Sequence, residues 1–142
     1  MRGELLQQLL KERFARLDLD DMDTESDRLR FDDEQRDEGE PAPERCGQLM
    51  QGQVSFFGTW SSRTMISVFE LVVPYADGPE VGKRIIGDGE RILVCIAGIG
   101  ASLHPDISGP QKIGDWVPTQ DQATGQISCR VSFAIAYQLT EF

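Results

Sequence analysis

The chain has 142 residues, 39% of them hydrophobic and 27% charged, with a formal net charge of -10. This length suffices for one domain with a core, so we expect a single domain over residues 1–142. The acidic surplus argues against binding nucleic acid through its phosphates, which needs clustered Lys and Arg. The opening residues carry Glu4, Lys11 and Glu12 among leucines, and no stretch approaches the roughly 20 apolar residues that span a bilayer. We therefore expect no signal peptide, no anchor and no membrane partner.

The first predicted element is an amphipathic helix from Arg2 to about Leu17. Its large apolar residues recur at steps of three and four, as they do along one face of a helix. The stripe consists of Leu5, Leu6, Leu9, Leu10, Phe14 and Leu17. Such a stripe packs either on the chain's own sheet, which we favour, or on a neighbouring subunit.

Residues 18–40 differ sharply in composition. Twelve Asp and Glu lie there against three Arg, so this run carries -9 of the net charge of -10. Repulsion between like charges keeps such a run extended, which predicts a solvated acidic loop over residues 18–45. Within it, Leu29 and Phe31 predict one short strand. We expect no calcium loop, because residues 18–25 lack the glycine that an EF-hand needs at its sixth position.

Two apolar segments follow. Residues 46–60, CGQLMQGQVSFFGTW, predict a short strand or an irregular loop. Residues 63–75, RTMISVFELVVPY, are apolar on both alternating faces and rich in β-branched and aromatic side chains. This pattern predicts a strand in the middle of a sheet, covered on both sides and ended by Pro74.

Residues 80–99 are compatible with two structures. One helical stripe runs through Val81, Ile85, Ile92, Cys95, Ile96 and Ile99. The alternative is a hairpin that turns at residues 87–89, because Asp-Gly is a favoured two-residue turn. We favour the helix, since the stripe persists through both halves of the segment. Residues 101–126 are polar and predict a long connection.

Residues 127–139, ISCRVSFAIAYQL, give the clearest pattern in the chain. Every odd position is apolar and every even one is polar or small, which predicts a strand with one face toward a core. Taken together, the elements predict an α+β fold: a small, mostly antiparallel sheet packed by the N-terminal amphipathic helix and a second central helix.

Catalytic and metal-binding motifs are weak. His104 is the only histidine, and its neighbours Ser102 and Asp106 do not make a triad, because triads assemble from distant segments. One histidine without paired cysteines disfavours a zinc site, and Gly98 and Gly100 fail the dinucleotide fingerprint. Cys46, Cys95 and Cys129 predict reduced, mostly buried thiols. We expect no metal, no cofactor and no enzymatic activity.

The carboxy half, ELVVPYADGPEVGKRIIGDGERILVCIAGI followed by CRVSFAIAYQL, resembles the tail terminator and tail-completion proteins of long-tailed bacteriophages. The resemblance lies in chain length, the N-terminal helix, a strand passing into a helix that ends near Leu103, and a closing aromatic strand. It implies a homohexameric ring that caps the tail tube and joins it to the neck. The implied partners are further copies of the chain, the tail tube protein and a neck or head-completion protein, with genomic DNA passing through without specific binding. The implied location is the virion, after synthesis in the host cytoplasm.

On this hypothesis the subunit contacts come from the first helix, the acidic loop and the connection at residues 102–126. The expected interface residues are Leu5, Leu9, Phe14, Asp20, Asp21, Asp32, Asp33, His104 and Trp116. Two alternatives stay open. One is an acidic binding module that masks a basic partner, and the other is a small enzyme with a pocket holding His104 together with Asp106 or Glu90.

Overall fold

The computed structural model describes residues 1–19, 28–31, 42–59 and 62–140. Two helices and a mixed six-stranded sheet make an α+β fold, which confirms the predicted class. The elements are α1 (Gly3–Ala15), β1 (Arg30–Phe31), β2 (Cys46–Thr59), β3 (Ser62–Tyr75), α2 (Val81–Ala97), β4 (Ile107–Ile113), β5 (Val117–Gln120) and β6 (Ile127–Gln138). The expected helix at residues 80–99 is therefore confirmed over the rival hairpin.

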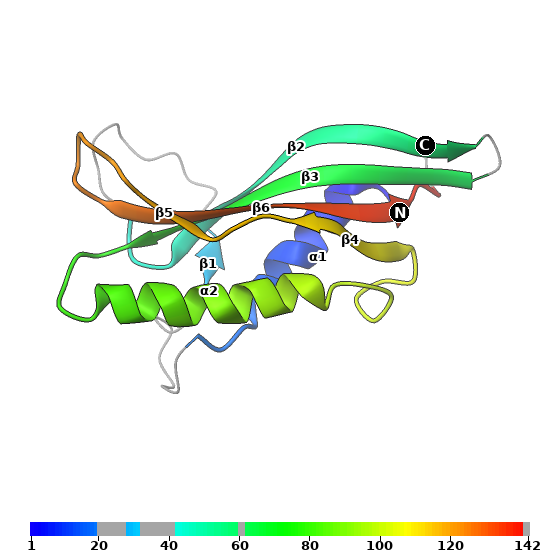
Figure 1. Ribbon diagram of the computed structural model, residues 1–142. Helices are drawn as coiled ribbons and strands as arrows, with labels where there is room; N and C mark the ends of the chain where they lie inside the picture. Colours follow the sequence, from blue (N-terminus) through cyan, green and yellow to red (C-terminus); the bar gives the residue numbers. More distant parts are fainter. Residues whose placement is uncertain (20–27, 32–41, 60–61, 141–142) are drawn as a thin grey trace.

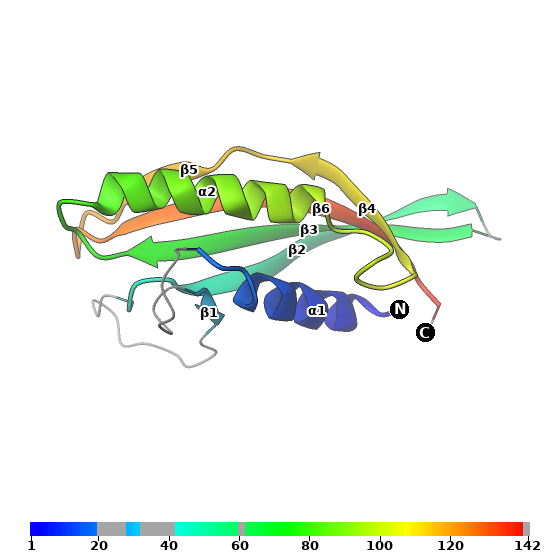
Figure 2. The same ribbon diagram turned by 90° about the horizontal axis from the view of Figure 1, so that it is seen from below.

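The sheet has the strand order β1-β2-β3-β6-β4, and β5 pairs with the other half of β6. The pairing of β1 with β2 is parallel and all others are antiparallel. Both helices lie on one face of the sheet, and the opposite face has no described element over it (Figure 1). Seen from below, the paired ends of β2 and β3 extend beyond the helices (Figure 2). The described molecule is thus a two-layer body with a projecting hairpin.

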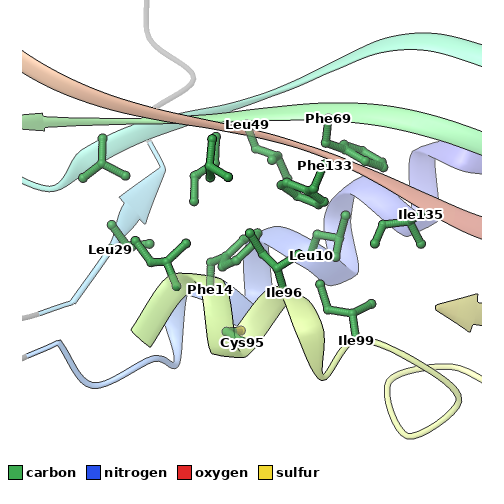
Figure 3. Close-up of a cluster of buried hydrophobic side chains, with 14 of the residues drawn as sticks. Leu10, Phe14, Leu29, Leu49, Phe69, Cys95, Ile96, Ile99, Phe133 and Ile135 are labelled. Carbon is green, nitrogen blue, oxygen red and sulfur yellow. The ribbon is translucent and has the colours of Figure 1, made fainter. Parts of the chain in front are cut away.

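The core lies between the helices and the sheet (Figure 3). Leu6, Leu10 and Phe14 of α1 are buried, so this stripe packs on the chain's own sheet as favoured. The Phe14 ring meets the edge of Phe133 at 6.0 Å between centroids, and Phe133 stacks on Phe69 at 5.6 Å. Full burial of each such side chain contributes about 1.5–3 kcal/mol.

The two main strands follow their predicted patterns, with one correction. β6 buries its odd positions from Cys129 to Tyr137, and β3 lies between β2 and β6 in the middle of the sheet. The prediction that β3 is covered on both faces is wrong, because only the row from Ser67 to Tyr75 faces the helices. Val68, in the other row, is 37% exposed. β3 also continues through Pro74, whose carbonyl accepts the Arg45 N–H at 2.8 Å.

Two segments at the edges of the sheet differ from their predicted structures. Residues 46–59 form one 14-residue strand rather than a short strand or an irregular loop. The supposed connection at residues 101–126 contains β4 and β5. All four β5 residues are exposed, and in β4 only Ile107 and Gly109 are buried. Edge strands with so little burial carry no hydrophobic alternation, so periodicity could not reveal them.

Two glycines inside α2 have opposite structural roles. A Cβ on Gly89 would lie 2.4 Å from Cδ1 of Trp116, whose indole donates a hydrogen bond to the carbonyl of Ile85 at 3.0 Å. A Cβ on Gly87 would meet nothing within 4 Å. Gly89 therefore makes room for the indole that fastens the β4–β5 connection to α2.

We expect Gly87→Ala to raise the free energy of unfolding by about 0.5–1 kcal/mol, because alanine is the better helix former. Gly89→Ala should lower it by about 1–2 kcal/mol, since displacing the indole costs more than the helix gains. Urea denaturation of the two variants checks both signs. Equal stabilisation by both substitutions would contradict the contact between Gly89 and Trp116.

Candidate functional site

The most deeply buried polar cluster joins Arg45, Tyr75 and Asp88. The Asp88 carboxylate accepts hydrogen bonds from Arg45 Nε and an Arg45 terminal nitrogen, both at 2.9 Å, and from the Tyr75 hydroxyl at 2.7 Å. Burial and the charge of Asp88 raise the pKa of Tyr75 well above its ordinary value, so the phenol keeps its proton and donates. The charged side chains are 2% and 1% exposed, so no substrate reaches them. The cluster is a structural lock between the start of β2, the end of β3 and α2.

The structure holds His104 against its own loop and apart from Glu90. Its Nδ1 accepts the backbone N–H of Asp106 at 3.0 Å and lies 3.9 Å from an Asp106 carboxylate oxygen. Glu90 instead lines a groove of about 350 Å³ between α1 and α2, and His104 is not part of that lining. Among the described residues, no three His, Cys, Asp or Glu side chains gather where they could hold a metal ion. Cys95 and Cys129 are buried, as predicted, and Cys46 is half-buried.

The outer surface of α2 carries exposed aliphatic side chains. Ile86 is 64% exposed and Val94 is 73% exposed, and the two are eight residues apart, on the same side of the helix. Between them on that side lies Glu90, and Val94 also borders the groove between the helices. We call Ile86 and Val94, with the groove, the helix surface. We take these exposed aliphatic side chains as a candidate interaction site.

The uncovered face of the sheet is also partly apolar. Val68 and Met50 are exposed there, and Val68 pairs with Ala134 of β6. One ion pair, between Arg130 and Glu70 at 3.3 Å, lies on the same face. We call this the sheet surface. It is the opposite side of the two-layer body from the helix surface (Figure 1).

The third apolar surface is the hairpin arm, which we define as residues 53–59 of β2 and 62–66 of β3. The paired ends of these two strands project past the helices (Figure 2). Phe56 is 58% exposed and Phe57 is 66% exposed. Neighbouring residues of a strand point to opposite faces, so the arm presents an aromatic ring on each side. A register shift between Gln51 and Val54 marks where the arm leaves the body.

The predicted interface residues have mixed outcomes. Phe14 is withdrawn from the interface, because it is fully buried against Phe133 in the protomer's own core. Trp116 is partly buried against α2, and Leu9 is partly buried against the core cluster. Leu5 and His104 keep accessible surface. Asp20, Asp21, Asp32 and Asp33 lie outside the described residues.

The acidic segment is anchored at the described positions that border it. Leu19 and Leu29 are fully buried in the core, although composition predicted a solvated run. Asp18 forms an exposed ion pair with Arg28 at 3.3 Å. Arg30 and Phe31 form the short strand β1, which confirms that prediction.

Sequence reasoning missed the main exposed apolar residues, although signals for them exist. Ile86 and Val94 are aliphatic residues of α2 that lie outside its predicted apolar stripe, and this departure from the stripe can be read from the sequence. Residues 46–59 contain no charged residue at all in a chain that is 27% charged. The signal for Val68 was hidden, because a strand that is apolar on both faces looks the same whether one face or both are covered.

Comparison with known proteins identifies no family. The chain matches no protein-family model, and a search of curated proteins finds no similar sequence. Within the described part of the chain, neither helix has the length and apolar composition needed to cross a membrane.

Proposed function

We propose that this chain is a structural virion protein, a phage tail terminator that forms a hexameric ring, caps the tail tube and joins it to the neck. Its partners are then further copies of itself, the tail tube protein and a neck or head-completion protein. Genomic DNA passes through the ring without specific binding. In this proposal the subunit is made in the host cytoplasm, resides in the virion and catalyses no reaction.

One observation carries the ring assembly. The two-layer body has exposed aliphatic side chains on both of its outer sides, and the two sides differ: Ile86 and Val94 on α2, Val68 on the sheet. A contact between two different surfaces is heterologous, and heterologous contacts close into rings when the rotation between neighbours allows it. When the helix surface of one subunit packs on the sheet surface of the next, the exposed aliphatic side chains of both surfaces are covered.

The charge distribution supports the passage of DNA. Residues 18–40 carry -9 of the net charge of -10, and a ring repeats that charge once per subunit. A concentrated negative potential repels phosphates and lowers the friction of DNA in a channel. The remaining body is almost neutral, which permits subunits to approach one another.

The decisive test is assembly. We expect the wild-type chain to form closed rings, seen by electron microscopy and by mass analysis, that bind the ends of tail tubes. Val94→Glu and Val68→Glu should each abolish rings, because each replaces an aliphatic side chain of the contact with a carboxylate that would have to lose its water. Ile113→Glu is the matched control and should leave rings intact, because Ile113 is as exposed as Val68 but pairs with Phe133 and so faces away from the sheet surface.

Mixing the two defective variants tests the head-to-tail contact itself. The Val94→Glu chain keeps an intact sheet surface and the Val68→Glu chain keeps an intact helix surface. Native mass spectrometry of an equimolar mixture should therefore show the mixed pair at more than twice the amount of either homodimer, which is the ratio that random pairing gives. A wild-type chain that never forms rings and never co-sediments with tail tubes would end the proposal.

A further inference from the structure

We propose that the outer edge of β2 is a strand-addition site, and that its occupant is the same edge of a second copy of this chain. The two copies of β2 pair antiparallel about a two-fold axis and join two sheets into one. This contact goes beyond the proposed ring. It is isologous and closes on itself, whereas a ring needs the heterologous contact of the helix and sheet surfaces.

The edge of β2 is open along most of its length. Among the described strands, β3 pairs with one side of β2, and β1 pairs with the other side only at Cys46 and Gly47. The side-chain amide of Gln7 donates to the Leu49 carbonyl at 2.9 Å. From Met50 to Thr59 no described strand lies beside this edge. A strand edge presents backbone N–H and C=O groups that pair readily with another strand.

Most edge strands are protected against such pairing, and β2 lacks the usual protection. Charged side chains and prolines block an edge, and β2 contains neither. The opposite edge of the sheet is protected: β4 contains Pro110 and Lys112, and β5 contains Pro118. The sheet therefore has one blocked edge and one permissive edge, and the permissive one carries the exposed Phe56 and Phe57.

Charge favours a second copy as the occupant. Two chains with a net charge of -10 each repel one another, so they associate best where neither surface is acidic. The described part of the arm carries one charged residue, Arg63, which is basic. The arm also projects beyond the helices, so paired arms let the two acidic chains meet without stacking their bodies (Figure 2).

The pattern along β2 is self-complementary in one register. In an antiparallel pair about an axis perpendicular to the sheet, opposed residues share a face, so the positions of each pair sum to an even number. Centring the open stretch on Ser55 places Ser55 opposite its symmetry mate and Val54 opposite Phe56 of the second copy. Apolar cross-strand pairs stabilise such a ladder, and this register opposes no like charges.

Matched serines on the two edges test the pairing. Ser55 is exposed on β2, and Ser108 is exposed on β4 at the blocked edge. Ser55→Lys brings two like charges face to face and should raise the dimer dissociation constant at least about fivefold in analytical ultracentrifugation. Ser108→Lys adds the same charge elsewhere and should leave the constant unchanged. Both are measured in the Val94→Glu chain, where the proposed ring contact is removed.

Cross-linking and hydrogen exchange test the register and the backbone pairing. With an oxidant, Ser55→Cys should give a disulfide-linked dimer, because opposed positions bring the two Cβ atoms close, and Ser108→Cys should not. Amide protection over residues 50–58 should rise with protein concentration in the wild type and not in Ser55→Lys.

Three results would overturn the pairing: a Val94→Glu chain that stays monomeric at all concentrations, equal effects of Ser55→Lys and Ser108→Lys, or a Ser55→Cys chain that does not cross-link. None of these touches the proposed ring. Conversely, a wild-type chain that forms no rings but still forms the Ser55-dependent dimer would reject the ring and leave the strand pairing intact.

Discussion

Replacing Asp88 with alanine should lower the free energy of unfolding by about 3–5 kcal/mol. The substitution leaves the Arg45 guanidinium buried without the carboxylate that accepts two of its hydrogen bonds, and it removes the acceptor of the Tyr75 hydroxyl. An uncompensated buried charge is far more costly than a lost surface contact. Urea denaturation followed by circular dichroism measures the loss.

Glu70→Ala is the matched control. It removes the carboxylate of another Arg–acid pair, the one with Arg130, but that pair lies on the exposed sheet surface. Screening by water limits the loss to about 0–1 kcal/mol. A loss from Asp88→Ala no larger than that from Glu70→Ala would contradict the enclosed geometry of the lock.

A second variant separates the net contribution of the lock to the free energy of unfolding from the loss caused by removing one of its members. The triple change Arg45→Met, Tyr75→Phe and Asp88→Leu replaces every polar member with an apolar side chain. Buried ion pairs replaced in this way are often no less stable, so the triple variant should recover most of what Asp88→Ala loses. If it does, the lock serves the position of its segments more than their stability.

That position matters for the proposed contacts. Arg45 has a positive φ of 60° and comes directly before β2, while Asp88 lies on the face of α2 opposite the exposed Ile86 and Val94. A non-glycine residue in this conformation costs about 1–2 kcal/mol, which the surrounding structure must offset. The lock therefore fixes the base of the strand that forms the arm against the helix that carries the helix surface.

The sequence predicted the elements whose burial follows a period. The alternation of residues 127–139 located β6, and the stripe from Val81 to Ile99 located α2 despite three glycines within the helix. The Asp88-Gly89 pair resembles a hairpin turn in the sequence, but its residue types are explained by contacts with other segments: Asp88 pairs with Arg45, and Gly89 makes room for Trp116. Neither contact is visible from local propensity.

The sequence did not predict the strands whose residues are mostly exposed. β5 is a strand with four exposed residues, and the arm of β2 projects past the core, so neither shows alternation. The interface residues predicted in the first helix were chosen from its apolar stripe, and one of them, Phe14, lies in the core. Exposed apolar residues on α2 and the arm could be recognised only once the buried ones had been accounted for.

Stability should also fall steeply in alkali, between about pH 9 and pH 11. Burial, followed by the nearby charge of Asp88, raises the pKa of the Cys129 thiol from its ordinary 9.0 to about 11. Below pH 9 the thiol is protonated in both states and its contribution is complete. Above pH 9 the unfolded chain loses that proton while the folded chain keeps it, so the folded state loses stability until pH reaches about 11.

A shift of two pH units at about 1.36 kcal/mol each gives a loss of about 3 kcal/mol from Cys129. Cys95, Tyr75 and Tyr137 also have raised pKa values, all with burial as the main cause, and they add to the fall in the same direction. Comparing Cys129→Ala with the wild type by urea denaturation under reducing conditions, at steps from pH 8 to pH 11, isolates the share of Cys129. The variant should have a constant offset near neutrality and a shallower slope above pH 9. Cys46→Ala should keep the wild-type slope, because Cys129 is still present, and a Cys129→Ala slope equal to that of the wild type would show that the fall comes from other groups.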